Sequence, residues 1–419
     1  MLKPICSLIL VLSMGLGYVN VFSQNQNCNG TRYYADIFSN YKVTYNVYYG
    51  QNTTVRGLPF ELKMDVYEPK NDPAPKRPVV IVIHGGGFTQ GAKDDIKPVA
   101  LCESFAKKGY VAASISYRTY DLYPVIPDST AFADAVIKAA SDLKAAVRFF
   151  REDAATINRF KVDPDYIFAG GGSAGGSTAL QATYLDDVTE APAYIRQLVT
   201  DNGGLRGSSS DNFEYSDAIQ GVFSASGGIL RPNFIDSNDP PLMCIHANGD
   251  GAVPYDVGPI YSDNFYVGTY YGSLAIYNRA QNVGVPSELI TVNANYHTNY
   301  FADPVWYDSL VNTAAATFYT VICQGSPTPK TDVMPNIGHK VYPNPADQSF
   351  IVEISDVFEQ DVIVNLYNQQ GQKVRTTNFS WANNITIHRD GLSPGVYIVE
   401  TIVRDKFGVF PLYDKILFK

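Results

Sequence analysis

The sequence predicts an α/β fold, in which a mostly parallel sheet carries helices on both faces, followed by a small all-β sandwich. In residues 78–322, continuous apolar runs alternate with segments of helical period, which is typical of buried parallel strands joined by helices. After residue 324 the helical period disappears, and short alternating segments are separated by turn signals. With 419 residues, 45% of them hydrophobic, the chain is long enough for two or three domains.

The elements of the first part follow in order. Residues 36–67 alternate polar with aromatic or aliphatic side chains, which predicts antiparallel strands that lead into the sheet. After a proline-rich connection over residues 69–78, strands are expected at residues 79–83, 111–115, 166–170, 219–223, 242–245 and 287–292. The clearest helix is expected at residues 129–155, where Asp128 or Ser129 caps the start. Further helices are expected from Ala174 onward, at residues 273–283 and at residues 304–321.

The second part contains only short expected strands. They lie at residues 350–354, 362–367, 385–387, 395–402 and 415–418. A segment of proline, serine, threonine and glycine from residue 324 separates them from the first part, as a linker does.

The net charge and the N-terminal segment indicate which partners and which cellular compartment to expect. The net charge is −9 and no cluster of Lys and Arg stands out, so nucleic acid is not an expected partner. Lys3, an apolar stretch over residues 5–21 and a small-residue site predict a secretory signal peptide at residues 1–23. A membrane anchor is the alternative, but the stretch is short and interrupted by serine and glycine, so no stable membrane span is expected. Cys6 lies inside this stretch, which argues against lipidation.

Two glycine-rich motifs carry the chemistry. Residues 171–175 read Gly-Gly-Ser-Ala-Gly and fit Gly-x-Ser-x-Gly, in which a sharp turn between a strand and a helix exposes a serine, here Ser173. Residues 84–88 read His-Gly-Gly-Gly-Phe, and bare amides in such a loop can approach the oxygen of a reacting carbonyl. Either motif alone can be coincidental, and a glycine run after a strand can be a phosphate-binding turn. Because the run lacks the ending of a nucleotide loop and both motifs follow strands, together they predict an acyl-transfer site.

A nucleophilic serine needs an imidazole, which in turn needs an orienting carboxylate. Among the five histidines, His297 is selected because it lies in a polar loop just after an expected strand, although a plain surface histidine is the alternative. His246 is set aside because it lies within a strand. Asp250 fits the carboxylate, since it follows a strand in a glycine-containing turn and precedes the histidine. Asp256 is the fallback, and a solvated turn aspartate is the plain alternative.

With these residues, the chain from about 32 to 323 resembles an α/β-hydrolase of the carboxylesterase type with an HGGG(F/W) oxyanion loop. It is similar to the hormone-sensitive-lipase-like group and to bacterial feruloyl or acetyl-xylan esterases. Residues 84–88 and 171–175 carry the match, together with residues 246–255, which resemble His-Gly-x-x-Asp-x-x-Val-Pro-Tyr. Ala247 and Tyr296 stand where that family has glycine. The resemblance implies oxyanion donors at the N–H groups of Gly86, Gly87 and Ala174, with His84 supporting the loop, and no metal or organic cofactor.

The C-terminal part resembles the type A sorting domain of the type IX secretion system. The match runs from Val-Tyr-Pro-Asn-Pro-Ala at residue 341 through Leu-Ser-Pro-Gly-Val-Tyr at residue 392 to the end of the chain. It implies the type IX secretion machinery as a partner and a location outside the cell or on its surface, reached through the periplasm. A carbohydrate-binding module is the alternative, with Trp381 as its only candidate aromatic platform. The expected domains are a signal peptide at 1–23, a catalytic domain at 24–323, a linker at 324–340 and the sandwich at 341–419.

Four cysteines remain after signal removal, and they allow three pairings. We predict a disulfide between Cys28 and Cys102, which lies at the start of an expected helix whose outer face is open to the N-terminal segment. Cys323 is the rival partner, because it ends the catalytic domain. Cys244 lies in an apolar strand, where a buried free thiol is the plain interpretation.

The leading functional hypothesis is a secreted serine carboxylesterase that acts through Ser173, His297 and Asp250 on small or polymeric esters. The alternatives are a prolyl-oligopeptidase-like peptidase and a non-catalytic adhesion protein on a hydrolase fold. Phe88, Tyr255, Tyr261 and Phe265 could form an aromatic wall for feruloyl esters or aromatic polyesters, although ordinary packing explains such rings equally well.

Overall fold

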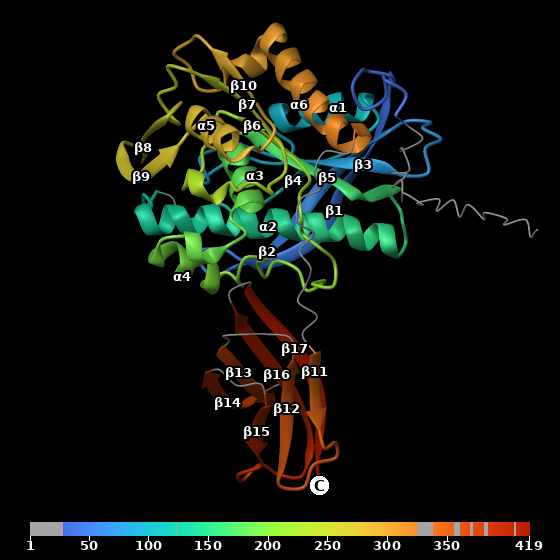
Figure 1. Cartoon of the computed structure of the whole chain (residues 1–419), viewed down its shortest axis with the longest axis vertical. Coiled ribbons are helices and arrows are strands. Elements are labelled where there is room, and N and C mark those ends of the chain that lie inside the picture. Colours follow the sequence, from blue (N-terminus) through green and yellow to red (C-terminus); the bar gives the residue numbers. More distant parts are fainter. Residues whose placement is uncertain are drawn as a thin grey trace, which may run out of the picture.

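The computed structural model describes residues 28–122, 124–324, 338–355, 361–368, 372–380, 384–405 and 408–419. The expected signal peptide and most of the expected linker lie outside these ranges. Figure 1 shows a helix-covered sheet followed by an all-β part. This arrangement confirms the predicted fold class.

The first part is built on an eight-stranded sheet with the order β1-β2-β4-β3-β5-β6-β7-β10. The two leading strands and the β2–β4 pair are antiparallel, and all other neighbours are parallel. The strands are β1 (Tyr41–Thr53), β2 (Pro59–Pro69), β3 (Arg77–Ile83), β4 (Val111–Ile115), β5 (Val162–Gly172), β6 (Val222–Ala225), β7 (Leu242–Ala247) and β10 (Ser287–Val292). Since the parallel strands run together, their carboxyl ends meet at one edge of the sheet.

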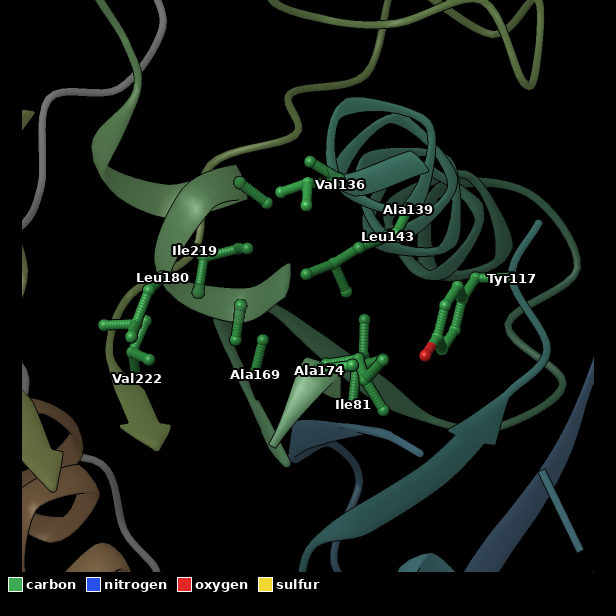
Figure 2. Close-up of a cluster of buried hydrophobic side chains, with 14 of the residues drawn as sticks. Ile81, Tyr117, Val136, Ala139, Leu143, Ala169, Ala174, Leu180, Ile219 and Val222 are labelled. Atoms are coloured by element: carbon green, nitrogen blue, oxygen red, sulfur yellow. The ribbon is translucent and has the colours of Figure 1, made fainter. Parts of the chain in front are cut away.

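Helices bury both faces of this sheet. Alternate residues of β3 enter two different cores: Ile81 joins one with α2 (Ser129–Ala155), α3 (Ala174–Tyr184), α4 (Ala193–Asp201) and α5 (Ser273–Val283), and Val82 joins the other with α1 (Ile96–Lys107) and α6 (Pro304–Gln324). Figure 2 shows Leu143 of α2 facing Ile81 in the first core. Burial on both faces explains why the core strands read as continuous apolar runs.

The predicted helices agree closely with the structure. Helix α2 spans the predicted residues 129–155, and the Asp128 carboxylate caps it by accepting hydrogen bonds from the backbone N–H groups of Thr130 and Ala131. Strand β6 is displaced from the predicted residues 219–223 to Val222–Ala225. A two-stranded hairpin of β8 (Val257–Ser262) and β9 (Phe265–Tyr271) was not predicted. Three short 3₁₀ helices complete this part: η1 (Val188–Glu190), η2 (Pro232–Phe234) and η3 (Asn299–Ala302).

The second part is a sandwich of two antiparallel sheets with the orders β11-β12-β15 and β14-β13-β16-β17. The strands are β11 (Gly338–Tyr342), β12 (Ser349–Ser355), β13 (Asp361–Tyr367), β14 (Lys373–Ser380), β15 (Asn384–His388), β16 (Gly395–Asp405) and β17 (Gly408–Phe418). Both sheets contribute to a hydrophobic core of their own, which includes Val352 and Val399. Trp381, the candidate aromatic platform, lies outside the described residues.

The predicted disulfide between Cys28 and Cys102 is wrong. Cys28 is bonded to Cys323, the rival partner, and the two Cα atoms are 5.6 Å apart. Cys102 is fully buried with Phe105 in the core beneath α1, because its side chain points toward the sheet and not toward the outer face of the helix. Cys244 is a buried free thiol, in agreement with the plain interpretation.

Within the described ranges, no helix is long and apolar enough to cross a membrane.

Candidate active site

Ser173 lies at the turn between β5 and α3, in a backbone conformation that side chains rarely adopt. Its φ is 55° and its ψ is −120°, and its N–H donates a hydrogen bond of 2.7 Å to the carbonyl of Ala225 at the end of β6. A Cβ atom at Gly171 or Gly175 would lie 2.1 Å from the Ile83 carbonyl oxygen, so the turn requires glycine at both positions. The strained turn presents the serine hydroxyl at the carboxyl edge of the sheet.

The structure brings Ser173, His297 and Asp250 together in one hydrogen-bonded chain. His297 Nε2 lies 2.7 Å from Ser173 Oγ, and His297 Nδ1 lies 2.7 Å from Asp250 Oδ2. The loop that carries the imidazole is held by Ser226, whose hydroxyl donates to the His297 carbonyl at 2.7 Å. The Asp256 backbone accepts a hydrogen bond from Gly272, and no hydrogen bond or ion pair joins its side chain to the His297 imidazole. Of the two carboxylates considered, the structure places Asp250 at the histidine.

Asp250 is held in its ionised form. Burial of the carboxylate is the largest influence and acts to raise its pKa, but hydrogen bonds from His246 and His297 and from the Ala252 N–H outweigh it. The net result is a pKa well below the usual range for aspartate. The side chain is 0% exposed, whereas that of His297 is 27% exposed. The buried carboxylate of Asp250 therefore contacts the imidazole of His297, which is partly exposed.

The glycine loop after β3 faces the same serine. The φ angles of Gly86 and Gly87 are +114° and +61°, and a Cβ at Gly86 would lie 2.1 Å from the Gln90 carbonyl oxygen. Within the described part of the chain, the N–H groups of these two glycines donate to no protein acceptor. Ala174 is the first residue of α3, where a backbone N–H has no partner inside the helix. These three residues, whose amides have no acceptor within the described ranges, line the same cleft as Ser173.

His84 lies beneath this loop. Its Nδ1–H donates to the Gly85 carbonyl at 2.8 Å, and its ring stacks on Tyr117 with the centroids 4.2 Å apart. The Tyr117 hydroxyl donates to the His84 carbonyl at 3.1 Å. Burial lowers the pKa of His84, which favours the neutral imidazole. These contacts connect the ring to the loop's backbone and to none of the three residues of the hydrogen-bonded chain.

A cleft of about 740 Å³ opens above Ser173 and His297. Of the four predicted wall residues, Phe88 and Tyr261 line it, together with Phe132, Tyr270 and Phe301. Tyr255 and Phe265 are not among its lining residues. Tyr255 lies at the base of the hairpin with its ring edge against His246, and Phe265 is 63% exposed beside the hairpin turn.

The sequence analysis set His246 aside as a strand residue and gave it no role in the site. It lies on β7, is 0% exposed, and its Nε2 atom is 3.1 Å from Asp250 Oδ2. The available signal was its position at the carboxyl end of a parallel strand, four residues before Asp250, where the turn brings the aspartate back over the strand.

Comparison with known families now places the two parts. Residues 64–226, which include Ser173 and the glycine loop, match the BD-FAE family. Residues 340–407 match the secretion system C-terminal sorting domain. The chain carries a BD-FAE α/β-hydrolase domain followed by a type IX sorting domain. The sorting domain indicates type IX secretion to the cell surface or beyond it.

Similarity to individual proteins is partial. This chain is 31% identical over 137 residues to the non-reducing polyketide synthase atr1 of Stereocaulon alpinum, and 28% identical over 127 residues to the methylphloroacetophenone synthase of Cladonia uncialis. These matches cover 32% and 30% of this chain, but only 5% of each synthase.

The solved structures that match this chain include esterases. The propionate-bound esterase Est2 of the planctomycete Thermogutta terrifontis gives a TM-score of 0.48 with 20% identity, covering 68% of this chain and 96% of the esterase. A truncated carbohydrate esterase from gut microbiota gives a TM-score of 0.47 with 18% identity, covering 68% of this chain and 98% of that esterase.

Proposed function

We propose that the BD-FAE domain is a serine carboxylesterase with Ser173 as nucleophile, His297 as general base and Asp250 as the orienting carboxylate. The observation that carries the proposal is the hydrogen-bonded chain from Asp250 through His297 to Ser173, with 2.7 Å at each step. A histidine bonded in this way carries its proton on Nδ1, so that Nε2 is free to accept the serine proton.

In the proposed reaction, Ser173 Oγ attacks the ester carbonyl carbon while its proton moves to His297 Nε2. The carbonyl oxygen becomes an oxyanion, which the N–H groups of Gly86, Gly87 and Ala174 stabilise by hydrogen bonding. Collapse of this intermediate releases the alcohol, which takes the proton from the imidazole, and leaves an acyl-enzyme. A water molecule activated by the same imidazole then releases the carboxylic acid.

Ser173→Ala tests the nucleophile. We expect kcat on p-nitrophenyl acetate to fall by roughly 10³-fold or more, because no acyl-enzyme can form. The fold should persist. Ser173→Gly should abolish activity and also raise the free energy of unfolding by about 1 kcal/mol, since glycine adopts this backbone conformation without strain. Retained hydrolysis in either variant would disprove the nucleophile assignment.

We also propose an aromatic or polysaccharide-linked acyl ester, of the feruloyl type or a polyester, as substrate. The β8–β9 hairpin supports this, because Ile260 and Tyr261 line the cleft while Tyr261 and Tyr266 stay more than half exposed beside it. Such rings offer flat surfaces for an aromatic acid or a sugar ring. A hydrolysis panel of acetylated xylan, feruloyl esters, short nitrophenyl esters and a polyester film tests the class. Preference for the nitrophenyl acetate over every larger ester would contradict it.

The domain limits remain our proposal, with the catalytic domain at residues 24–323 and the sorting domain at 341–419. Each part has its own hydrophobic core, which supports independent folding. A chain truncated after Gln324 should keep full esterase activity in solution. In the native host the same chain should accumulate in the periplasm, and normal export would contradict the sorting role.

A further inference from the structure

A second imidazole contacts the carboxylate of Asp250. His246 Nε2 lies 3.1 Å from Asp250 Oδ2, the same oxygen that faces His297 Nδ1 at 2.7 Å. Both side chains of this inner pair are 0% exposed. The second histidine is therefore within hydrogen-bond distance of the proposed triad but is closed off from the cleft.

The surroundings of His246 fix where its proton lies. Nε2 faces two acceptors, Asp250 Oδ2 and the Val253 carbonyl at 3.2 Å, so this nitrogen must carry the hydrogen. On the other side of the ring, Nδ1 lies 2.8 Å from the hydroxyl of Ser273, in the first turn of α5. This hydroxyl can donate to the unprotonated nitrogen. The hydrogen bonds of the ring therefore select the tautomer with the proton on Nε2.

Each oxygen of the Asp250 carboxylate has two hydrogen-bond donors. Oδ1 accepts the N–H groups of Ala252 at 2.8 Å and Val253 at 3.1 Å, and Oδ2 accepts the two imidazoles. Other titratable groups near the pair include the buried phenol of Tyr300 in η3, which the Asp250 charge influences, and Tyr255, whose ring lies edge-on to His246. The Cys244 thiol also hydrogen-bonds with the Ser273 hydroxyl that faces His246 Nδ1. Without the donor at Nε2, one side of Oδ2 would lose its partner in a buried site.

We propose that His246 is a positioning residue of the esterase: its Nε2–H fixes the plane of the Asp250 carboxylate so that Oδ2 meets the His297 Nδ1–H. This inference rests on the proposed triad. His246 touches no substrate, and its effect passes through Asp250 to His297. Its role therefore predicts a loss in kcat with little change in KM, since substrate binding in the cleft is not altered.

The experiment compares three substitutions in the full secreted chain. His246→Leu removes the donor, and His246→Gln keeps an N–H near the position of Nε2. Ile245→Ala, at the neighbouring buried position on β7, controls for lost packing without loss of a donor. Values of kcat and KM on p-nitrophenyl acetate are measured for each, and for His246→Leu in an Asp250→Asn background.

We expect His246→Leu to lower kcat by about 10- to 100-fold, as expected for loss of a buried hydrogen bond to a charged group, with KM changed by less than about 3-fold. His246→Gln should recover most of this loss, and Ile245→Ala should keep a near-normal kcat while its Tm falls. In the Asp250→Asn background, His246→Leu should cost less than about 3-fold more, since its effect passes through the missing carboxylate.

Three results overturn the inference: an unchanged kcat in His246→Leu, a folded His246→Gln as slow as His246→Leu, or an equal loss with and without Asp250. Nitrogen NMR of histidine-labelled wild type covers the case in which His246→Leu does not fold. It should find the His246 proton on Nε2, with a signal that moves in Asp250→Asn, and a proton on Nδ1 alone refutes the geometry. If Asp250→Asn itself keeps its kcat, the triad fails; if it is slow and His246→Leu is not, only the positioning role fails.

Discussion

The disulfide between Cys28 and Cys323 should contribute much of the stability of the catalytic domain. It connects the first described residue to the end of α6 across a sequence separation of 295 residues. For a loop of that length, the chain-entropy relation gives a stabilisation of about 6 kcal/mol at 25 °C, an upper figure because measured disulfides usually contribute about 2–4 kcal/mol. Replacing both cysteines by serine should therefore lower the free energy of unfolding by about 2–5 kcal/mol.

Urea unfolding measures this difference. The chain has two tryptophans, and Trp381→Phe leaves Trp306 of α6 as the single reporter of the catalytic domain. In that background, Cys28→Ser/Cys323→Ser should lower the urea midpoint by roughly 1 M with little change in esterase activity at low urea. Cys102→Ala is the matched control, because it removes a buried thiol that forms no bond.

Peptide mapping of the unreduced protein supplies the direct check. It should recover a peptide that contains Cys28 joined to Cys323, and native alkylation should leave Cys102 unmodified, since burial raises the pKa of this thiol well above its ordinary value. A Cys28–Cys102 peptide, or an urea midpoint that does not move in the double variant, would refute the reasoning.

Three further outcomes are expected. Gly86→Ala should lower kcat by about 10²-fold, because its Cβ would lie 2.1 Å from the Gln90 carbonyl oxygen. Gly87→Ala has open space at its Cβ and should lower kcat by less than about 10-fold. Equal losses of kcat in the two variants would contradict this. Tyr261→Ala should raise KM for a feruloyl ester by about 3- to 10-fold and Phe265→Ala should not, since only the tyrosine lines the cleft. Asp250→Asn should lower Tm at neutral pH by an amount that shrinks below about pH 4. The sign follows because the pKa of Asp250 is lower in the folded protein than in the unfolded chain. The ionised carboxylate therefore adds stability above the ordinary carboxyl pKa, and this stability is lost on acidification. A Tm difference between wild type and Asp250→Asn that is constant with pH would count against this reasoning.

The fold was predictable where burial imposes a clear pattern. Strands β3 and β4 are buried at every position, so their sequences are continuous apolar runs that predict buried strands. Helix α2 combines a capping aspartate with an apolar face, and both signals predict the same helix. Strand β14 was missed because its only apolar residues are Val374, which is exposed, and Phe379, so its alternation of exposed and half-buried positions is not marked by apolar side chains. The β8–β9 hairpin was missed because its exposed strand positions carry aromatic residues such as Tyr261 and Phe265, which look like core residues in sequence.

The candidate site was predictable as far as local motifs reach. Ser173 is identified by the glycines around it, and Asp250 and His297 by their places after strands. The pairing of Cys28 depends on which way a helix turns its cysteine, and this is decided by packing between distant elements. His246 was set aside because a strand position suggests packing, although the last turns of parallel strands are also where polar groups of a site gather.

The sheet explains how groups from distant parts of the sequence are brought together. Strands β5, β7 and β10 deliver the serine, the aspartate and the histidine, while β6 lies between the first two of these strands and supplies none of the three. The end of β6 nevertheless holds two of them: Ala225 accepts the Ser173 N–H at 2.7 Å, and Ser226 donates to the His297 carbonyl at 2.7 Å. Ser226 has a φ of +53°, and its own N–H donates to Ile245 on β7. The backbones of Ser173 and His297 are therefore both hydrogen-bonded to one strand end, through the Ala225 carbonyl and the Ser226 hydroxyl. The hydrogen bonds among the side chains of Ser173, His297 and Asp250 therefore form between residues whose backbones the sheet already holds in place.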